Sequence, residues 1–343
     1  EATVSFFVYH FLFVHYVFFL DGPIFSFQLQ NHIKILHNAA LCALQAKKYV
    51  YSYECMAKCI QTSPSLFARK PKCWLHMAEG CIGLHLQKKH TTDDLGRDDL
   101  VGSGSLLAIN DIMYESRKQS EELPLLLSGV LGSEEDISQL LRAPLQRALF
   151  CLNNALNLCT PGTEKDNIGT NMHDHEEAIR ILVAYVRLEL GDPVVALTMA
   201  KSVLSRNVDS PTSISIKRKA LARLYACEAL CCIGNAPAAL QIILKSDMES
   251  VSDSEQRHPP ADPIEKLVDD MSWKMDKGEA RALVNVAFSA TFAANDELGK
   301  AENHAKVALA VNLKSVNARN ALLFCLLRRG DTAGALNILR MSR

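Results

Sequence analysis

Small and large apolar residues recur at helical spacing from about residue 31 to the end of the chain. Leu36, Ala40 and Ala43 fall on one face of a first predicted helix, and Met56 and Cys59 fall on one face of the next. An apolar residue at every third or fourth position is typical of an amphipathic helix. Because short polar turns separate such stretches, the pattern predicts antiparallel helix pairs.

The helix pairs repeat along the chain. Ala301 and Ala335, two small residues expected where the helices of a pair cross, are 34 positions apart, whereas Ala196 and Ala239 are separated by 43. A helix–turn–helix unit of 34 residues is typical of the tetratricopeptide repeat (TPR), whose units stack into a solenoid. The sequence therefore predicts an all-α TPR α-solenoid of antiparallel helix pairs. An irregular helical bundle with alanine-rich seams is the alternative.

Three segments interrupt the predicted repeats, and the shortest of them, residues 160–175, is predicted to be a loop. A stretch with several glycines and acidic residues is predicted to be a flexible insertion. A later stretch carries nine acidic and five basic residues together with three prolines, which predicts an acidic, disordered linker. The predicted organisation is TPR helices at 31–86, the insertion at 87–140, TPR helices at 141–244, the linker at 245–277 and C-terminal TPR helices at 278–343.

The first 30 residues do not fit the repeat pattern. Residues 4–20 are rich in Phe, Val and Tyr and contain no charged side chain apart from two histidines. This length is at the short end for crossing ~30 Å of hydrocarbon, and the basic start and cleavage site of a signal peptide are missing. We interpret residues 1–30 as a gene-model artefact or detached fragment, with a membrane anchor as the alternative.

The charge balance excludes a generally basic protein. Lys and Arg total 37 against 38 Asp and Glu, so the whole chain has no positive charge to attract nucleic acid or an anionic membrane. Several arginines near the C-terminus, among them Arg319, Arg328 and Arg340, form a local basic face. Only Phe324 could stack on a base there, so we interpret that face as a solvated helix surface.

No catalytic motif is present in the sequence. It contains no phosphate-binding G-x-x-x-x-G-K-[ST], no G-x-S-x-G and no H-E-x-x-H. The acidic residues within 173–177 suit the start of a helix better than a metal site. Cys55/Cys59 and Cys227/Cys231 are pairs on single helices that lack a second pair of zinc ligands, so buried packing is expected. We expect no enzyme activity, cofactor, metal or small-molecule substrate.

Three strings resemble one family. These are L-E-L-G-D-P-V-V-A-L at 188–197, W-L-H-M-A-E-G-C-I at 74–82 and L-N-N-A-L at 152–156, which are similar to subunit ten of the CCR-NOT mRNA deadenylase complex. The similarity spans about 31–343 and corresponds to the family's C-terminal half. It implies a non-catalytic scaffold subunit in mRNA decay, deadenylation and translational repression. The implied partners are the large scaffold subunit and the eleventh subunit, in the cytoplasm and also in the nucleus.

In a TPR array, one face of the first helix of each pair lines an inner groove. The register places large apolar residues on that face, and such residues dominate interface energies. The candidate partner-binding anchors are Tyr185, Leu188, Leu224, Phe324 and Leu327. Each could instead be covered by the next repeat. Two other functions stay open, an unrelated TPR adaptor in chaperone or transport machinery and an RNA-binding helical repeat.

Overall fold

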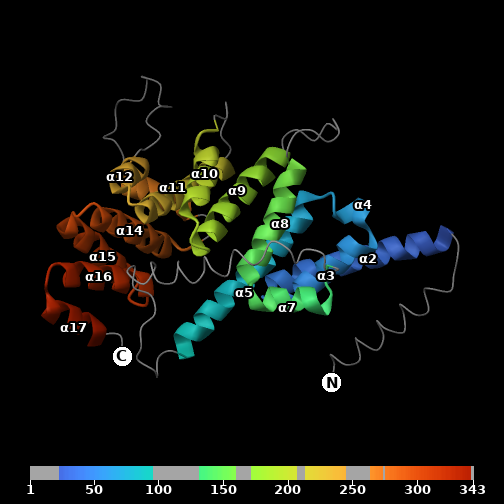
Figure 1. Ribbon diagram of the computed structural model, residues 1–343, viewed down its shortest axis with the longest axis horizontal. Helices are drawn as coiled ribbons and strands as arrows, with labels where there is room; N and C mark the ends of the chain where they lie inside the picture. The colour runs from blue at the N-terminus through green and yellow to red at the C-terminus, as the bar shows by residue number, and fades with distance from the viewer. Residues whose placement is uncertain are drawn as a thin grey trace. The chain divides into compact units, whose positions relative to one another are not determined.

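The computed structural model describes residues 23–95, 131–159, 171–206, 213–244, 263–272 and 275–340 (Figure 1). These residues form helices joined by turns, with no strand among them, so the all-α prediction is confirmed. None of these helices is long and apolar enough to span a bilayer. The apolar segment 4–20 lies outside the described residues. The chain divides into two compact units, residues 1–91 with 128–158 and residues 92–127 with 159–343.

The first unit contains two helix pairs and two short helices. Ser52 donates a hydrogen bond of 2.8 Å to the Ala40 carbonyl where α2 and α3 cross, as expected for small residues at that position. Trp74 of α5 meets Phe150 of α8 edge to face, with ring centroids 6.0 Å apart. The helices are α2 (Pro23–Gln45), α3 (Tyr49–Thr62), α4 (Pro64–Phe67), α5 (Pro71–Leu95), α7 (Glu134–Arg142) and α8 (Pro144–Cys159).

The second unit is a row of helix pairs. The first helices of the pairs, α9, α11, α14 and α16, pack each against the next, and α10, α12, α15 and α17 pack against their own first helices. Figure 1 shows α14 to α17 in succession at one end of this unit. The helices are α9 (Asn171–Glu189), α10 (Pro193–Leu204), α11 (Ser213–Ile233), α12 (Ala236–Leu244), α13 (Pro263–Met271), α14 (Lys277–Ala294), α15 (Leu298–Val311), α16 (Val316–Arg328) and α17 (Thr332–Arg340).

Small residues fill the helix crossings of the second unit, as the sequence predicts. Ala196, Ala239, Ala301 and Ala335 are all buried. Ser289 donates a hydrogen bond of 2.8 Å to the Ala301 carbonyl, which repeats at α14 and α15 the contact seen between α3 and α2. A small side chain lets two backbones approach closely enough for this bond, so these residues define the register of each pair.

The turn between α9 and α10 shows how the sequence separates two helices of a pair. Gly191 has a φ of 76°, a left-handed backbone conformation that residues other than glycine rarely adopt. Asp192 then caps α10 by accepting a hydrogen bond of 3.3 Å from the Val195 backbone N–H. Pro193 occupies the first turn of α10, where no backbone donor is lost.

The described structure differs from the sequence expectation at the predicted insertion and at the predicted linker. α5 continues to Leu95 and α7 begins inside the predicted insertion 87–140, while α13 lies inside the predicted linker 245–277. α13 buries Leu267, Val268 and Met271 against the core, and it packs against α11 and α14 as α12 does. The sequence analysis missed this short apolar face because the surrounding residues of the predicted linker are mostly acidic and polar. Residues 96–130 and 245–262 lie outside the described residues.

Most cysteines serve as small core residues. Eight of the eleven are buried, whereas Cys42 and Cys232 are exposed and Cys231 is half-buried. Burial raises the pKa of the Cys59 thiol to about 12, which keeps it protonated and unreactive at neutral pH.

Candidate partner-binding surface

The five predicted anchors occupy three helices of the second unit. Tyr185 and Leu188 on α9 are half-buried, as is Phe324 on α16. Leu327 on α16 is 59% exposed, whereas Leu224 on α11 is only 7% exposed. Leu224 lies in the core cluster that α11 shares with α13 and α14, so it is covered by the neighbouring helices. All five stay predictions as binding residues.

An aromatic and acidic group lies where α9 and α11 pack together. The rings of Tyr185 and Tyr225 are 6.0 Å apart and tilted. Glu189 and Glu228, which are both exposed, are close enough to act on the two phenols. Burial, with help from Glu228 and Glu189, raises the pKa of Tyr225 to about 12. This part of the surface therefore offers aromatic area together with negative charge.

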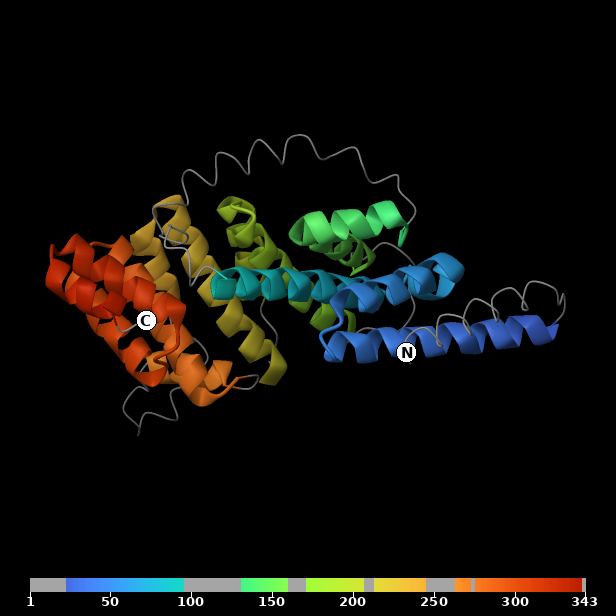
Figure 2. The ribbon, with the colours of Figure 1, turned by 90° about the horizontal axis from the view of Figure 1, so that it is seen from below.

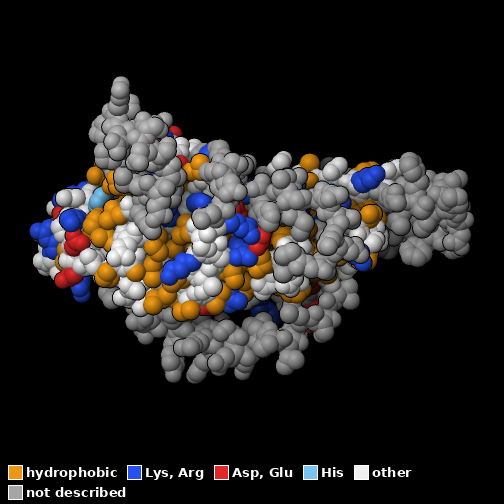
Figure 3. Space-filling view, turned by 90° about the horizontal axis from the view of Figure 1, so that it is seen from above, with side chains coloured by type: hydrophobic (Ala, Val, Ile, Leu, Met, Phe, Trp, Pro, Cys, Tyr) orange, Lys and Arg blue, Asp and Glu red, His pale blue; other side chains and the backbone are white. Residues whose placement is uncertain are grey.

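The opposite end of the row is apolar and basic. The Arg328 guanidinium lies 6.0 Å from the centroid of the Phe324 ring, a cation–π arrangement. Arg328 also forms an exposed ion pair with Asp296, with 3.6 Å between nitrogen and oxygen. Charged side chains, many of them Lys and Arg, gather over the end of the unit that holds α15, α16 and α17 (Figure 3). The carboxylates of Glu189 and Glu228 thus lie beside the tyrosines at one end of the row, and Arg328 lies beside Phe324 at the other.

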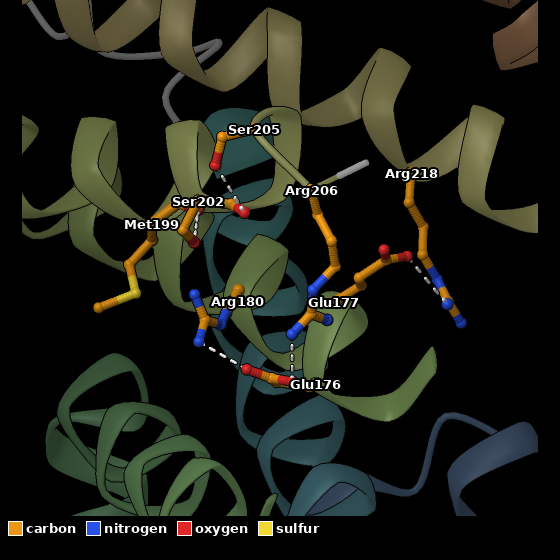
Figure 4. A network of polar contacts seen from close by, with 8 residues as sticks. All are labelled: Glu176, Glu177, Arg180, Met199, Ser202, Ser205, Arg206 and Arg218. Atoms are coloured by element: carbon orange, nitrogen blue, oxygen red, sulfur yellow. Dashed lines mark hydrogen bonds and ion pairs between the residues drawn. The ribbon is translucent and has the colours of Figure 1, made fainter. Parts of the chain in front are cut away.

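A network of ion pairs holds the start of this row together (Figure 4). Glu176 on α9 accepts hydrogen bonds from Arg180 of the same helix at 2.5 Å and from Arg206, just after α10, at 2.6 Å. Glu177 pairs with Arg218 of α11 at 3.7 Å. Because α9 begins at Asn171, these carboxylates lie in its second turn and join three helices instead of capping the helix start. No cluster able to hold a metal ion occurs in the described parts of the chain.

We expect Glu176→Gln to lower the free energy of unfolding by about 1–3 kcal/mol at pH 7, since Glu176 is buried and the substitution weakens two charge-assisted hydrogen bonds. Burial alone would raise the pKa of Glu176, but Arg206 and Arg180 hold it below its usual value. A lowered folded pKa means that the contribution is complete above about pH 4.3, the unfolded value, and is lost at lower pH.

Urea unfolding of the wild-type chain and Glu176→Gln at several pH values would measure this contribution. The difference should be constant near neutrality and shrink below about pH 4.3. Glu279→Gln is the matched control, because Glu279 is an exposed glutamate on α14 of the same unit. An equal effect of both substitutions would contradict the role of the network.

A comparison with protein families finds a match within the second unit. Residues 176–332 match the model of the CNOT10 tetratricopeptide repeat domain. The match begins in α9 and ends at the start of α17, so it includes most of α9, the other three first helices and all five predicted anchors. No curated protein matches the chain at a significant level.

The match shows that the chain resembles CNOT10, a TPR protein, over 176–332, and it supports the predicted TPR fold class. The L-E-L-G-D-P-V-V-A-L string that carried the resemblance lies inside the matched range, whereas the strings at 74–82 and 152–156 lie outside it. The resemblance of the first unit to the CNOT10 family therefore stays a prediction.

Sequence reasoning missed that Tyr225 lies beside Tyr185 where α9 and α11 pack together. The repeat register pointed to Leu224, but successive residues on a helix are about 100° apart. This single step turns Leu224 toward α13 and α14 and turns Tyr225 toward Tyr185. An aromatic residue beside an assigned groove position was the available signal.

Proposed function

We propose that the chain is a non-catalytic scaffold subunit of the CCR-NOT deadenylase complex that acts in mRNA turnover and translational repression. The observation that carries the proposal is the match of 176–332 to the CNOT10 TPR domain. A TPR row supports such a role because its first helices offer an extended surface to other proteins. The proposed partners are the large scaffold subunit and the eleventh subunit, in the cytoplasm and also in the nucleus.

Binding would bury the surface of the first helices. A partner segment would cover Tyr185 and Tyr225 at one end and Phe324 at the other. Large aromatic side chains of this kind supply most of the energy at protein interfaces. Positive residues of the partner would lie over Glu189 and Glu228, which would fix the direction in which the segment binds.

Co-purification of the chain with the N-terminal region of the scaffold subunit, with and without the eleventh subunit, tests the proposal. We expect a ternary complex that survives high salt, since apolar contacts are not screened. Leu188→Asp on α9 should remove the complex without loss of helicity. Val194→Asp is the control, because Val194 is exposed on α10, in the other layer of helices.

Two results would contradict the proposal. One is the absence of a complex with either partner, and the other is equal binding by Leu188→Asp and the wild-type chain. Circular dichroism of both variants separates a lost contact from a lost fold, because Leu188 is half-buried and its replacement could disturb packing.

A further inference from the structure

A cavity lies between α2 and α4 of the first unit. These two helices lie close together in two perpendicular views (Figure 1, Figure 2). The cavity has a volume of about 190 Å³. Its described walls come from α2, from α4 and from the turn after α4, and they are Ile33, Lys34, Leu66, Phe67 and Lys70. We refer to this space as the α2–α4 cavity.

The interior of the α2–α4 cavity is apolar. Ile33 is buried, and the Phe67 ring is 7% exposed and lies 5.3 Å from the His37 ring of α2. Leu66 is 43% exposed, so part of one apolar wall faces solvent. An apolar cavity of about 150 Å³ can hold a benzene molecule. The α2–α4 cavity is therefore large enough for one aromatic or aliphatic side chain, but not for a helix.

The next first helix of the chain, α5, is already in place beside this cavity. Gly80 of α5 lies close to Leu44 near the end of α2. The Trp74 indole of α5 donates a hydrogen bond of 2.8 Å to the Ala68 carbonyl, in the turn after α4. Because α5 contacts both α2 and this turn, the cavity does not result from the lack of a following repeat.

The edge of the cavity is basic. Lys34 and Lys70 are both exposed, and neither forms an ion pair within the described part of the chain. The Lys70 ammonium lies 5.5 Å from the centroid of the Phe67 ring, so the charge stands over the apolar wall. Arg69 in the same turn and Lys72 at the start of α5 are exposed as well.

Acidic residues are scarce in this part of the chain. Residues 23–78 contain seven lysines and arginines but one acidic residue, Glu54 of α3. The α2–α4 cavity therefore combines an apolar interior with positive charge that its own surroundings do not neutralise. Opposite charges across an interface attract, whereas like charges facing each other are unfavourable. An acidic occupant is thus favoured, and a second copy of the same surface is disfavoured.

A peptide suits this cavity better than a nucleic acid does. Binding of single-stranded nucleic acid relies on exposed aromatic rings on which bases stack. Phe67 is the aromatic residue of the described walls, and its ring is buried in the wall. A partner protein instead gains affinity by placing a large apolar side chain in a pocket whose edge carries polar or charged groups.

We propose that the α2–α4 cavity binds an acidic peptide segment of another protein. One large apolar side chain of the segment enters the cavity, and carboxylates on either side of it pair with Lys34 and Lys70. The site lies in the first unit, outside the range that matches the CNOT10 TPR domain. It therefore does not depend on membership of the CCR-NOT complex.

Three labelled peptides separate the apolar contact from the charge. The first is Glu-Glu-Ser-Phe-Ser-Glu-Glu, the second has Ser in place of Phe, and the third has Gln in place of each Glu. Fluorescence anisotropy would measure the binding of each peptide to the full chain. We expect the first peptide to bind about tenfold more tightly than either of the others at low salt. Its advantage over the Gln peptide should shrink as salt is added.

Charge reversal at the edge of the cavity tests the carboxylate contacts. Lys34→Glu with Lys70→Glu should weaken binding of the first peptide at least about tenfold and leave binding of the Gln peptide unchanged. Lys47→Glu with Lys48→Glu is the matched control, because these two lysines are exposed in the turn between α2 and α3 and the change of net charge is the same.

A substitution in the wall of the cavity tests the apolar contact. Leu66→Ser should weaken binding of the first peptide about tenfold, with no effect on the peptide that lacks Phe. Leu141→Ser is the matched control, because Leu141 on α7 of the same unit is also 43% exposed. Circular dichroism of both variants would show that the helices are intact.

Several outcomes would overturn the proposal. They are equal binding of the three peptides, equal losses in the two lysine pairs, or equal losses in Leu66→Ser and Leu141→Ser. A single-stranded RNA that binds as tightly as the first peptide would make a nucleic acid the occupant. In sedimentation, a dimer that Lys34→Glu with Lys70→Glu disrupts would make a second copy the occupant. Co-purification of this variant with the scaffold subunit tests the proposed function separately.

Discussion

Replacing Arg147 with methionine should destabilise the first unit by about 3–5 kcal/mol, the cost of leaving one partner of a buried ion pair without the other. Arg147 on α8 forms an ion pair with Asp136 on α7, and both side chains are buried. Methionine keeps most of the side-chain volume, so the loss would reflect the uncompensated carboxylate of Asp136 and not a cavity.

The hydrogen bonds around the pair explain why the loss should be large. Tyr53 of α3 donates to an Asp136 oxygen at 3.0 Å and accepts from the Nε of Arg147. The Gly132 backbone N–H also donates to Asp136, at 2.6 Å. Burial raises the pKa of Tyr53 well above its ordinary value, which keeps the phenol protonated as a donor. The packing of α3, α7 and α8 therefore depends on one hydrogen-bonded network. Removing one member of such a network breaks more than one bond.

Urea unfolding, followed through the transition of the first unit, would give the free energy of unfolding of each variant. Hydrogen exchange at the α7 amides would show whether α7 detaches first. Arg142→Met is the matched control, because Arg142 is an exposed arginine at the end of α7 that bonds within its own helix, to Ser138. The double variant with Asp136→Asn should recover part of the stability, since no charge is then left buried. Equal costs for Arg147→Met and Arg142→Met would rule out this role for the network.

The helix crossings could be predicted from the sequence because their determinants are local. A helix that must approach another closely needs a small residue at the contact, and Ala301 and Ala335 reveal it by their spacing alone. The turn at Gly191 and Asp192 could be interpreted in the same way, since a left-handed glycine and a helix cap are signals within a few residues. The overall helical array needed no information from distant parts of the chain.

The network around Asp136 could not be predicted, because its members are far apart in sequence. Tyr53 and Asp136 are 83 positions apart, and Tyr53 and Arg147 are 94 apart. Nothing local indicates that α7, inside a polar stretch, is held by a buried carboxylate. α13 was missed for a related reason, since its apolar face of Leu267, Val268 and Met271 lies within an acidic range.

The surface chemistry was predicted in part. Apolar character on the first helices was expected, but whether Leu224 faces a partner or the core depends on α13, whose position the sequence did not reveal. Leu327 likewise is exposed on α16, the last first helix among the described residues of this unit. Burial at a repeat position is thus set by the neighbouring elements, which the pattern of one helix does not contain.

The second large effect is expected in the core of the second unit. Phe288→Ala should lower the free energy of unfolding by about 3–5 kcal/mol, the usual cost of removing a buried phenylalanine. Phe288 on α14 is among the largest fully buried side chains of the chain's described part. Its ring lies 6.2 Å from Phe292 and 5.4 Å from His304 of α15, measured between centroids. Its removal would leave a cavity among α11, α13 and α14, whose residues share one core cluster with it.

Leu283→Ala provides the comparison, because Leu283 is on the same helix but exposed, and its replacement should cost well under about 1 kcal/mol. The contrast tests the register of α14 directly, since the two positions lie on different faces of the helix. If the register were shifted by one or two residues, the costs of the two substitutions would converge. A large loss for Phe288→Ala alone would confirm that this face of α14 is buried against α11 and α13.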